Sequence, residues 1–393
     1  MRRGAPIALF WLFYFAGLGV FFPYYSLYLR ENAGLSGIHV GMVMSVIPLV
    51  GLMAQPMWGN VADRLGARST VLAFLTAAAA LGYYAISFVS GFAGILTATA
   101  VMALFATAVI PLSVSVALAA LDQSGPHAFG LTRVWGTVGY LIAVASFPAL
   151  LDWWQSTSPV SGVEGVSEPG LSLMFAVIAG ASGAAALVGL WLPRDGSLRV
   201  RAKRGDWRIL VAVRPAVALF AVVFLSFLFL QGPMALFPIL VRSRGGDIET
   251  VGRLWVVMLM LEIPLIAASG AGLDRLGARA ILTIGVVCGG IRWLVCGLET
   301  STPIFYAVQV LHGVTVTGLM VGGPLYLDQV VPEKLRSTSQ GMLAMCGIGA
   351  GGLISNVLTG WLIDHASPEM PYLLGGAGAV LLGLTLRWVL PKV

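Results

Sequence analysis

The sequence predicts an all-α membrane protein, and its composition and hydropathy carry that prediction. Only 10% of the 393 residues are charged, whereas soluble proteins carry about a quarter. The mean hydropathy is +0.91, and the shortage of charge extends along the whole chain. A water-soluble fold could not cover its surface with so few charged side chains, so we expect most of the chain to lie in a lipid bilayer.

Twelve apolar stretches are long enough to cross a membrane as helices, which takes roughly 20 residues each. We expect these spans at 6–29, 38–61, 70–90, 93–118, 128–151, 170–192, 213–241, 250–271, 280–298, 303–327, 337–362 and 370–390. The first stretch follows Arg2 and Arg3 and has no small-residue cleavage site, so it predicts a membrane helix and not a cleavable signal peptide.

The distribution of Lys and Arg orients these spans. Most of the 23 Lys and Arg fall on one side if the N-terminus is cytoplasmic, and the densest cluster lies between the sixth and seventh spans. Because cytoplasmic loops collect positive charge, we expect both termini in the cytoplasm. The segmentation then predicts a six-helix bundle over 1–193, a cytoplasmic linker over 194–212 and a second six-helix bundle over 213–393.

Charge and cysteine usage argue against several other classes. The net charge of +6 is explained by topology, so we expect no nucleic-acid partner. Cys288, Cys296 and Cys346 lie in apolar runs without CxxC spacing, so we expect neither a disulfide nor a metal site. We find no HExxH motif, nucleophile motif or Walker loop, and we expect no cofactor and no enzyme. A membrane-embedded enzyme and a channel are the alternatives from other classes.

One hexapeptide occurs twice. Asp63–Arg68 recurs letter for letter as Asp274–Arg279, each copy after the second span of its half and four residues after a glycine. The preceding glycine would let a neighbouring helix pack closely, the acid can pair with arginine or a helix N-terminus, and the inner glycine permits a tight turn. The two copies therefore predict a cytoplasmic gate, although any single arginine could simply set topology. The predicted gate residues are Gly59, Asp63, Arg64, Gly66, Arg68, Gly270, Asp274, Arg275, Gly277 and Arg279.

The pattern G-x3-D-R-x-G-x-R of the first copy resembles the signature of the major facilitator superfamily. Five further segments resemble lactose permease, the phenylpropionate-permease-like transporters and the nucleoside–proton symporters, namely Phe10–Pro23, Ala54–Pro56, Phe129–Gly136, Ile291–Trp293 and Gln309–Gly313. The resemblance implies two six-helix bundles, a multi-pass protein of the cell inner (plasma) membrane, and secondary transport by alternating access.

Three ionisable residues lie within consecutive predicted spans. Glu262 is in the middle of the eighth span, Arg292 is in the ninth and His312 is in the tenth. A charged side chain costs at least about 2.5 kcal/mol at the membrane centre, so it needs a partner or a task. Burial favours the neutral form of a carboxyl group, which suits a proton carrier. The resemblance implies that these three residues couple transport to protons. A structural ion pair for Glu262 and a helix-packing hydrogen bond for His312 are the alternatives.

The expected substrate contacts lie in both halves. The resemblance implies that Arg133 contacts the solute and that Tyr140 stacks on it, although Tyr140 could equally serve packing. Polar or aromatic residues within spans complete the set, namely Tyr24, Gln231, Gln309 and Asn356. Asp364 lies near a helix end and is predicted to act as a gate or cap residue.

The sequence also departs from lactose permease. No acid occurs in Pro111–Val116 of the fourth span, and Gly347–Gly349 replaces a buried lysine in the eleventh. An arginine without a fixed acid has room for a substrate carboxylate, although Asp122 could still reach Arg133. We therefore expect a monomeric proton-coupled symporter of a small organic solute, with an aromatic or other organic acid preferred. A sugar or nucleoside symporter and a lipid or drug exporter of the same fold are the alternatives.

Overall fold

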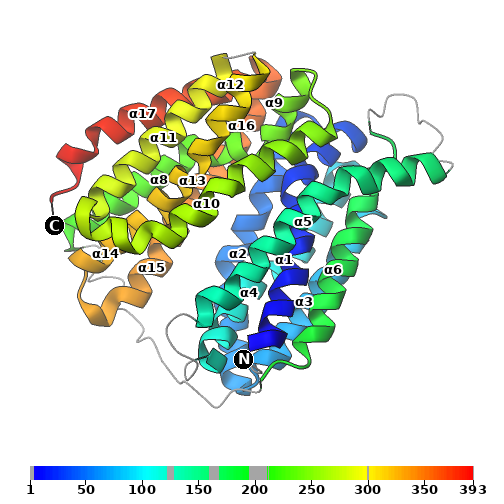
Figure 1. Ribbon diagram of the computed structural model, residues 1–393, viewed down its shortest axis with the longest axis horizontal. Coiled ribbons are helices and arrows are strands. Elements are labelled where there is room, and N and C mark those ends of the chain that lie inside the picture. The colour runs from blue at the N-terminus through cyan, green and yellow to red at the C-terminus, as the bar shows by residue number, and fades with distance from the viewer. Residues whose placement is uncertain are drawn as a thin grey trace. The chain divides into compact units, whose positions relative to one another are not determined.

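A computed structural model of the chain consists of helices and short connections throughout the residues that it describes (Figure 1). These residues are 4–121, 128–158, 168–193, 210, 212–298 and 301–392, and the side chains of residues 266–275, 334 and 337 also lie outside the description. Helices are expected here because hydrocarbon offers the backbone no hydrogen-bond partner, so each segment must satisfy its own N–H and C=O groups.

The chain divides into two compact units. Unit 1 comprises residues 1–35 and 46–200, and unit 2 comprises residues 36–45 and 201–393. The helices of unit 1 are α1 (Gly4–Leu27) with the π-helical turn η1 (Tyr28–Asn32), α2 (Gly37–Leu65), α3 (Arg68–Ile86), α4 (Gly91–Leu121), α5 (Ala128–Thr157) and α6 (Leu173–Gly189). Helix α2 is shared, because its first turns, Ser36–Ser45, belong to unit 2.

Unit 2 contains more interrupted helices. Its elements are α8 (Arg214–Ala235), α9 (Phe237–Ser243), α10 (Ile248–Leu276), α11 (Ala278–Leu298), α12 (Thr302–Ala307), η3 (Val308–Val310), α13 (Leu311–Thr317), η4 (Gly318–Gly322), α14 (Gly323–Val330), η5 (Glu333–Leu335), α15 (Arg336–Ala344), η6 (Met345–Gly351), α16 (Gly352–His365) and α17 (Met370–Val389). The η4 and η6 turns are π-helical. Single π-helical turns within α-helices are often found at functional sites.

Ten helical segments of the described residues are long and apolar enough to cross a membrane. Helix α6 has 17 residues and is shorter, and α10 covers the predicted span 250–271. The total of twelve spans and the cytoplasmic termini stay predictions.

The expectation of one continuous helix over 213–241 is wrong, because the chain breaks at Leu236 between Pro233 and Pro238. Residues 194–209 and 211 of the predicted linker lie outside the described residues.

Close helix contacts in unit 1 bring α1 against α5. A Cβ atom at Gly139 would lie 2.0 Å from the backbone oxygen of Leu12, and one at Gly19 would lie 2.5 Å from that of Tyr140. Only glycine permits backbones to approach this closely. This contact fixes the α1 aromatic side chains beside the first turns of α5.

In unit 2, glycine plays the same part where α13 meets α10. A Cβ atom at Gly313 would lie 2.7 Å from the backbone nitrogen of Glu262. Helix α11 packs on the other side of α13, where Gly289 faces Thr315. The three elements that carry Glu262, Arg292 and His312 are therefore held together by close contacts at glycines.

Candidate functional site

Arg292 is the centre of a buried polar cluster in unit 2. Only 2% of the residue is exposed. Its Nε donates to Gln309 Oε1 at 2.9 Å, its Nη1 lies 3.0 Å from His312 Nδ1, and its Nη2 lies 3.2 Å from the sulfur of Met258. The guanidinium carbon lies 3.9 Å from the ring centre of Trp293. Within the described part of the chain, the hydrogen-bond partners of this guanidinium are therefore neutral groups.

Gln309 holds Arg292 in place. Its side chain is fully buried, and its Nε2 donates to the carbonyl of Phe305 at 2.8 Å and lies 3.3 Å from Cys296 Sγ. With Nε2 used in this way, Oε1 is fixed toward Arg292. This position suits a residue that orients the guanidinium, and the predicted contact between Gln309 and substrate stays a prediction.

The contact with Arg292 determines which ring nitrogen of His312 carries the hydrogen. A guanidinium has only donor hydrogens, so His312 Nδ1 must accept from Arg292. The proton of the neutral imidazole is then on Nε2. That nitrogen lies 3.7 Å from Glu262 Oε2, with both side chains partly exposed. His312 thus links the guanidinium to the carboxylate through its two ring nitrogens.

The three residues that the sequence places in consecutive spans are therefore brought together, in the order Arg292, His312, Glu262. The cluster holds one fixed positive charge and one carboxyl group whose charge depends on its proton. When the carboxylate of Glu262 is ionised, its charge and that of Arg292 sum to zero. When the carboxylate is protonated, the cluster carries the single positive charge of Arg292. This arrangement can bind or release a proton and can respond to a nearby anion.

Unit 1 holds a second arginine in an aromatic setting. The guanidinium carbon of Arg133, on α5, lies 4.1 Å from the ring centre of Phe15 and 5.5 Å from that of Trp11, both on α1. Arg133 is only partly buried. A Cβ atom at Gly136 would lie 2.6 Å from Arg133 Nη1, so glycine leaves the space in which the guanidinium lies along α5.

Trp11 is anchored by the fourth span. Its Nε1 donates to Ser113 Oγ at 3.0 Å, and its ring meets Phe129 edge-on at 5.5 Å. A serine hydroxyl on α4 thus binds the indole that flanks Arg133. Asp122, named as a possible partner of Arg133, lies outside the described residues.

The aromatic candidates differ in their surroundings. Tyr140 is partly buried and packs against the core of unit 1, and it lies seven residues after Arg133 on α5, roughly 10 Å along the axis. Tyr24 is fully buried, its hydroxyl donates to the carbonyl of Val144 at 3.1 Å, and its ring lies 4.9 Å from Phe147. Tyr24 therefore joins α1 to α5 in this structure. Substrate contact stays a prediction for both residues and gains no support at Tyr24.

Two polar candidates of unit 2 lie on α8 and α16. Gln231 is partly buried, and a Cβ atom at Gly352 would lie 3.2 Å from its Cγ. Asn356 is 3% exposed, and among the described residues its Oδ1 has no hydrogen-bond partner. A buried acceptor without a partner is costly, which makes Asn356 a candidate for contact with a solute. Both roles stay predictions.

The first copy of the repeated loop forms a local ion pair. Arg68 Nη2 lies 2.7 Å from Asp63 Oδ1, and Gly66 between them has φ of +61°, as expected for a tight turn. Arg64 is exposed. Among the described residues, nothing beyond its own stretch of helix lies within 4 Å of a Cβ atom built at Gly59, and the close packing of a helix there stays a prediction.

The second copy repeats the turn of the first. Gly277 has φ of +77°, and Arg279 Nη1 donates to the carbonyl of Leu390 at 3.1 Å. The surroundings of Gly270 and the side chains of Asp274 and Arg275 lie outside the description. The gate role of both copies stays a prediction.

Asp364, predicted as a gate or cap residue, caps a helix that is far away in sequence. Its Oδ1 accepts from the backbone nitrogen of Gly37 at 2.7 Å, and its Oδ2 accepts from that of Ile38 at 2.8 Å. These are the first residues of α2. A Cβ atom at Gly360 would lie 2.0 Å from the carbonyl oxygen of Gly37, so the start of α2 lies directly on α16.

Some site residues were not predicted. Met234 and Met258 surround Arg292 with sulfur atoms, Phe15 stacks on Arg133, and Ser113 anchors Trp11. Nothing in the sequence separates these from ordinary core residues. Among the described residues, no group of three or more His, Cys, Asp or Glu side chains could hold a metal ion.

A family model and two known proteins match most of this sequence. A model of the MFS_1 like family matches residues 5–374. The maltose permease of Geobacillus stearothermophilus is 28% identical over 371 residues, which cover 92% of this chain and 88% of the permease. The protein of Escherichia coli (strain K12) named "Probable 3-phenylpropionic acid transporter" is 25% identical over 399 residues, covering 98% of this chain and 97% of that protein.

The solved structures show the same fold. A crystal structure of a mutant of the nucleoside transporter NupG superposes with a TM-score of 0.87 at 16% identity, covering 99% of this chain and 100% of that one. A D-xylose–proton symporter gives a TM-score of 0.72 at 14% identity, covering 99% and 97%.

Proposed function

Because the chain belongs to the MFS_1 like family, and is thus a multi-pass membrane transporter of the major facilitator superfamily and not an enzyme, we propose that it carries a small organic solute together with a proton. The proposal includes twelve spans with both termini in the cytoplasm, a plasma-membrane location and a monomeric protein. Transport then proceeds by alternating access, with the repeated loops after the second span of each half forming the cytoplasmic gate.

The proton coupling rests on one observation, the contact of His312 Nε2 with Glu262 at 3.7 Å while Nδ1 is held by Arg292. In this arrangement Nε2 already bears a hydrogen and the lone pair of Nδ1 is occupied. His312 thus has no free site for a further proton. Glu262 is the proton carrier, and the Nε2–H of His312, oriented by Arg292, faces its carboxylate.

The cycle follows from the charges. With Glu262 ionised, its charge and that of Arg292 offset each other through His312. A proton that binds a carboxylate oxygen of Glu262 leaves the charge of Arg292 uncompensated. A solute anion carried in the same step offsets that charge, so proton and anion favour each other's binding. Release of both on the other side returns the site to its first state.

An aromatic or other organic acid is the preferred solute. Arg133 combines a cation with the flat faces of Phe15 and Trp11, a setting that suits a carboxylate attached to an apolar or aromatic body. The relative named for 3-phenylpropionic acid covers nearly all of both chains. The alternative is a sugar, which the maltose permease favours at 28% identity.

One experiment tests the coupling and the solute together. Purified protein in vesicles with an imposed pH difference is offered 3-phenylpropionate, maltose or a nucleoside. We expect uphill accumulation of the organic acid, lost in Glu262→Gln, which still exchanges solute across the membrane. Glu249→Gln is the matched control, because Glu249 is on the same helix, is exposed and pairs with Arg253. Full accumulation by Glu262→Gln would remove this carboxyl group from the mechanism, and accumulation of maltose alone would establish the sugar alternative.

A further inference from the structure

Met258 lies one helical turn before Glu262 on α10. Residues four positions apart lie on the same face of a helix, so the two side chains face the same neighbours. The sulfur of Met258 lies 3.2 Å from Arg292 Nη2, and Glu262 Oε2 lies 3.7 Å from His312 Nε2. Helix α10 therefore meets the cluster at two points, with an apolar side chain against the guanidinium and a carboxyl group against the imidazole.

The side of Arg292 that faces α10 is occupied by a group without charge. Met258 is fully buried. A second methionine, Met234 on α8, places its sulfur 3.7 Å from both Nη1 and Nη2. A thioether sulfur is only a weak acceptor, so neither methionine offsets the positive charge of the guanidinium.

The position of Met258 lies between the two charges of the cluster. Side chains of an α-helix lean toward its N-terminus, so Glu262 leans toward Met258, which lies roughly 6 Å away along the axis. If Cγ, Sδ and Cε of Met258 were removed, the carboxylate would have room to turn toward the Arg292 guanidinium. An opposite charge within about 4–6 Å favours the ionised form of a carboxyl group by about one to three pH units.

We propose that Met258 is a positioning residue that keeps the Glu262 carboxylate and the Arg292 guanidinium from pairing directly. The inference rests on the proposed role of Glu262 as the proton carrier. A directly paired carboxylate would stay ionised where a carrier has to bind a proton. With Met258 in place, the two charges are linked through His312, which orients the carboxylate without fixing it in its ionised form.

Other charged groups also lie on the elements that pack against α10, which are α13, η3, α11 and α9. Those that this part of the structure directs toward Glu262 are His312 of α13 and Arg292 of α11. The charged side chains of α9 and of the first turns of α10 and α11 form bonds elsewhere, namely Arg242, Glu249, Arg253 and Arg279. Truncating the methionine therefore changes the separation of two charges and removes none.

The protonation of Glu262 can be followed without a transported solute. A protonated carboxyl group has a C=O stretching band in the infrared that its ionised form lacks, and the band that Glu262→Gln removes belongs to Glu262. Infrared spectra of the full-length protein in detergent, recorded over a range of pH, give the midpoint at which half of this carboxyl group is protonated.

We expect Met258→Ala to move the midpoint toward acid by about one pH unit or more, because the carboxylate then pairs with Arg292. Met258→Leu keeps the approximate volume of the side chain without its sulfur and should keep the midpoint of the unmodified protein. Met258→Val is a milder truncation, and a smaller shift of the same sign is expected, which keeps the test decisive if Met258→Ala folds poorly.

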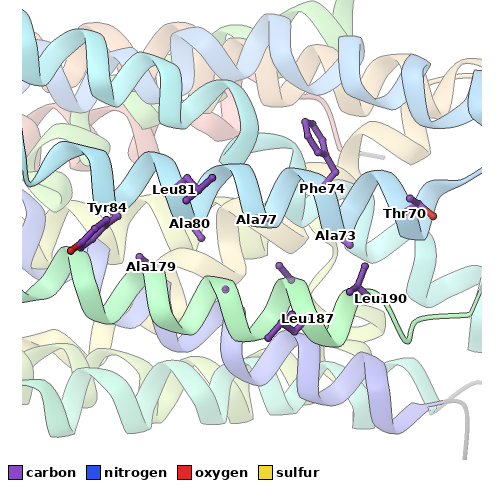
Figure 2. A pocket seen from close by; sticks show the side chains of 12 residues that line it. Thr70, Ala73, Phe74, Ala77, Ala80, Leu81, Tyr84, Ala179, Leu187 and Leu190 are labelled. Carbon is purple, nitrogen blue, oxygen red and sulfur yellow. The ribbon is translucent and has the colours of Figure 1, made fainter.

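Two truncations control for the loss of apolar packing. Met234→Ala removes the same atoms beside Arg292, but from α8, and should leave the midpoint unchanged. Leu187 of α6 lines an apolar groove between α3 and α6 in which no described lining residue is charged (Figure 2). Leu187→Ala should leave the midpoint unchanged as well.

The outcomes separate this inference from the proposed function. A midpoint that stays unchanged or moves toward alkaline pH in Met258→Ala and Met258→Val would overturn the role of Met258. An equal acid shift in Met258→Leu or in Met234→Ala would also overturn it, and in all these cases Glu262 remains the proton carrier. If Glu262→Gln removes no pH-dependent carboxyl band, the proposed function itself fails, and the role of Met258 fails with it.

Discussion

Two arginines, Arg292 in unit 2 and Arg133 in unit 1, lie within apolar helices but in different surroundings. Arg292 is fully buried, and its hydrogen-bond donors are directed at a glutamine, a histidine and two methionine sulfurs. Arg133 is partly buried and lies over the rings of Phe15 and Trp11. The first is held by side chains from several helices, and the second has two aromatic rings of α1 beside its guanidinium.

The difference suggests a division of labour. A guanidinium whose donors are used by fixed neighbours acts as a stationary charge, and moving it would break several contacts. A guanidinium that lies over aromatic rings is suited to bind a planar group such as a carboxylate through two parallel hydrogen bonds. Substituting each arginine should therefore affect different measurable properties.

The largest effect is expected at Arg292. Arg292→Met removes the charge and leaves Gln309 Oε1 and His312 Nδ1 as buried acceptors without a donor, at a cost of about 1–3 kcal/mol each in the free energy of unfolding. His312 is then free to carry its proton on either nitrogen, so we expect loss of pH-driven accumulation as well as a lower melting temperature. Uptake into vesicles and thermal unfolding in detergent measure the two effects.

Arg292→Lys is the informative companion. Lysine keeps the positive charge but replaces the planar set of guanidinium donors by a single ammonium group. Compared with Arg292→Met, we therefore expect it to regain part of the stability but little of the pH-driven accumulation. Coupling as strong in Arg292→Met as in the unmodified protein would show that the cluster is only structural.

An intermediate effect is expected at Arg133, and mainly on solute affinity. Arg133→Gln removes a charged partner worth about 1.5–3 kcal/mol to a bound carboxylate, which corresponds to a roughly 10- to 150-fold higher KM for an organic acid. The lost stacking is worth about 0.5–1 kcal/mol, so the melting temperature should change little. Initial rates of uptake over a range of solute concentrations measure KM.

A neutral solute provides the control for this variant. If maltose binds at the same site, its KM should rise much less than that of the acid. An unchanged KM for the acid would mean that Arg133 does not recognise the carboxylate and would shift the preference toward a sugar.

The smallest effect is expected outside both sites, at the start of α10. Asp247 Oδ1 accepts from the backbone nitrogen of Thr250 at 2.7 Å and from its hydroxyl at 2.6 Å, and these bonds, the hydroxyl first, lower the pKa of Asp247. Asp247→Ala should lower the free energy of unfolding by about 0.5–2 kcal/mol at neutral pH and leave transport unchanged.

The sign of the pH dependence follows from the lowered pKa. The contribution of the Asp247 carboxylate is complete above its ordinary pKa of about 4 and is lost as the pH falls through the lower value of the folded state. The difference between Asp247→Ala and the unmodified protein should thus shrink in acid. Asp247→Asn keeps a side chain that can cap α10 but has no charge. We expect its free energy of unfolding at neutral pH to be close to that of the unmodified protein, with a contribution from residue 247 that does not change with pH. A large loss of stability in this variant would contradict the capping role of Asp247.

The sequence predicted the positions of most helices, because hydrophobic stretches of sufficient length leave few other structures in a bilayer. The last span, expected at 370–390, is observed at Met370–Val389. The prediction of continuous α-helices failed where the backbone departs locally from α-helical geometry. The break at Leu236 and the π-helical turn Met345–Gly351 both lie in continuous apolar runs, and hydropathy does not register either of them.

The candidate site was predictable in part. A carboxyl group, an arginine and a histidine in successive apolar spans had to find partners, and the structure joins them in one cluster. The sequence could not show that Gln309 orients Arg292, because that bond joins two helices whose rotation is set by packing. The sequence does not indicate that Met234 and Met258 contact Arg292, since methionine is a common core residue. The cap of α2 by Asp364 joins residues more than 300 positions apart and depends on the tertiary fold.

The first turn of α2 is attached to α16 mainly by peptide groups and by one acidic side chain. Glycines at positions 37, 41 and 360 let the backbones of the two helices approach each other closely. Separating them would break two charge-assisted hydrogen bonds to Asp364 and the hydrogen bond that Ser45 Oγ donates to the carbonyl of Leu353. Because two of these bonds require the N–H groups at the very start of α2, they set the register in which α2 lies on α16.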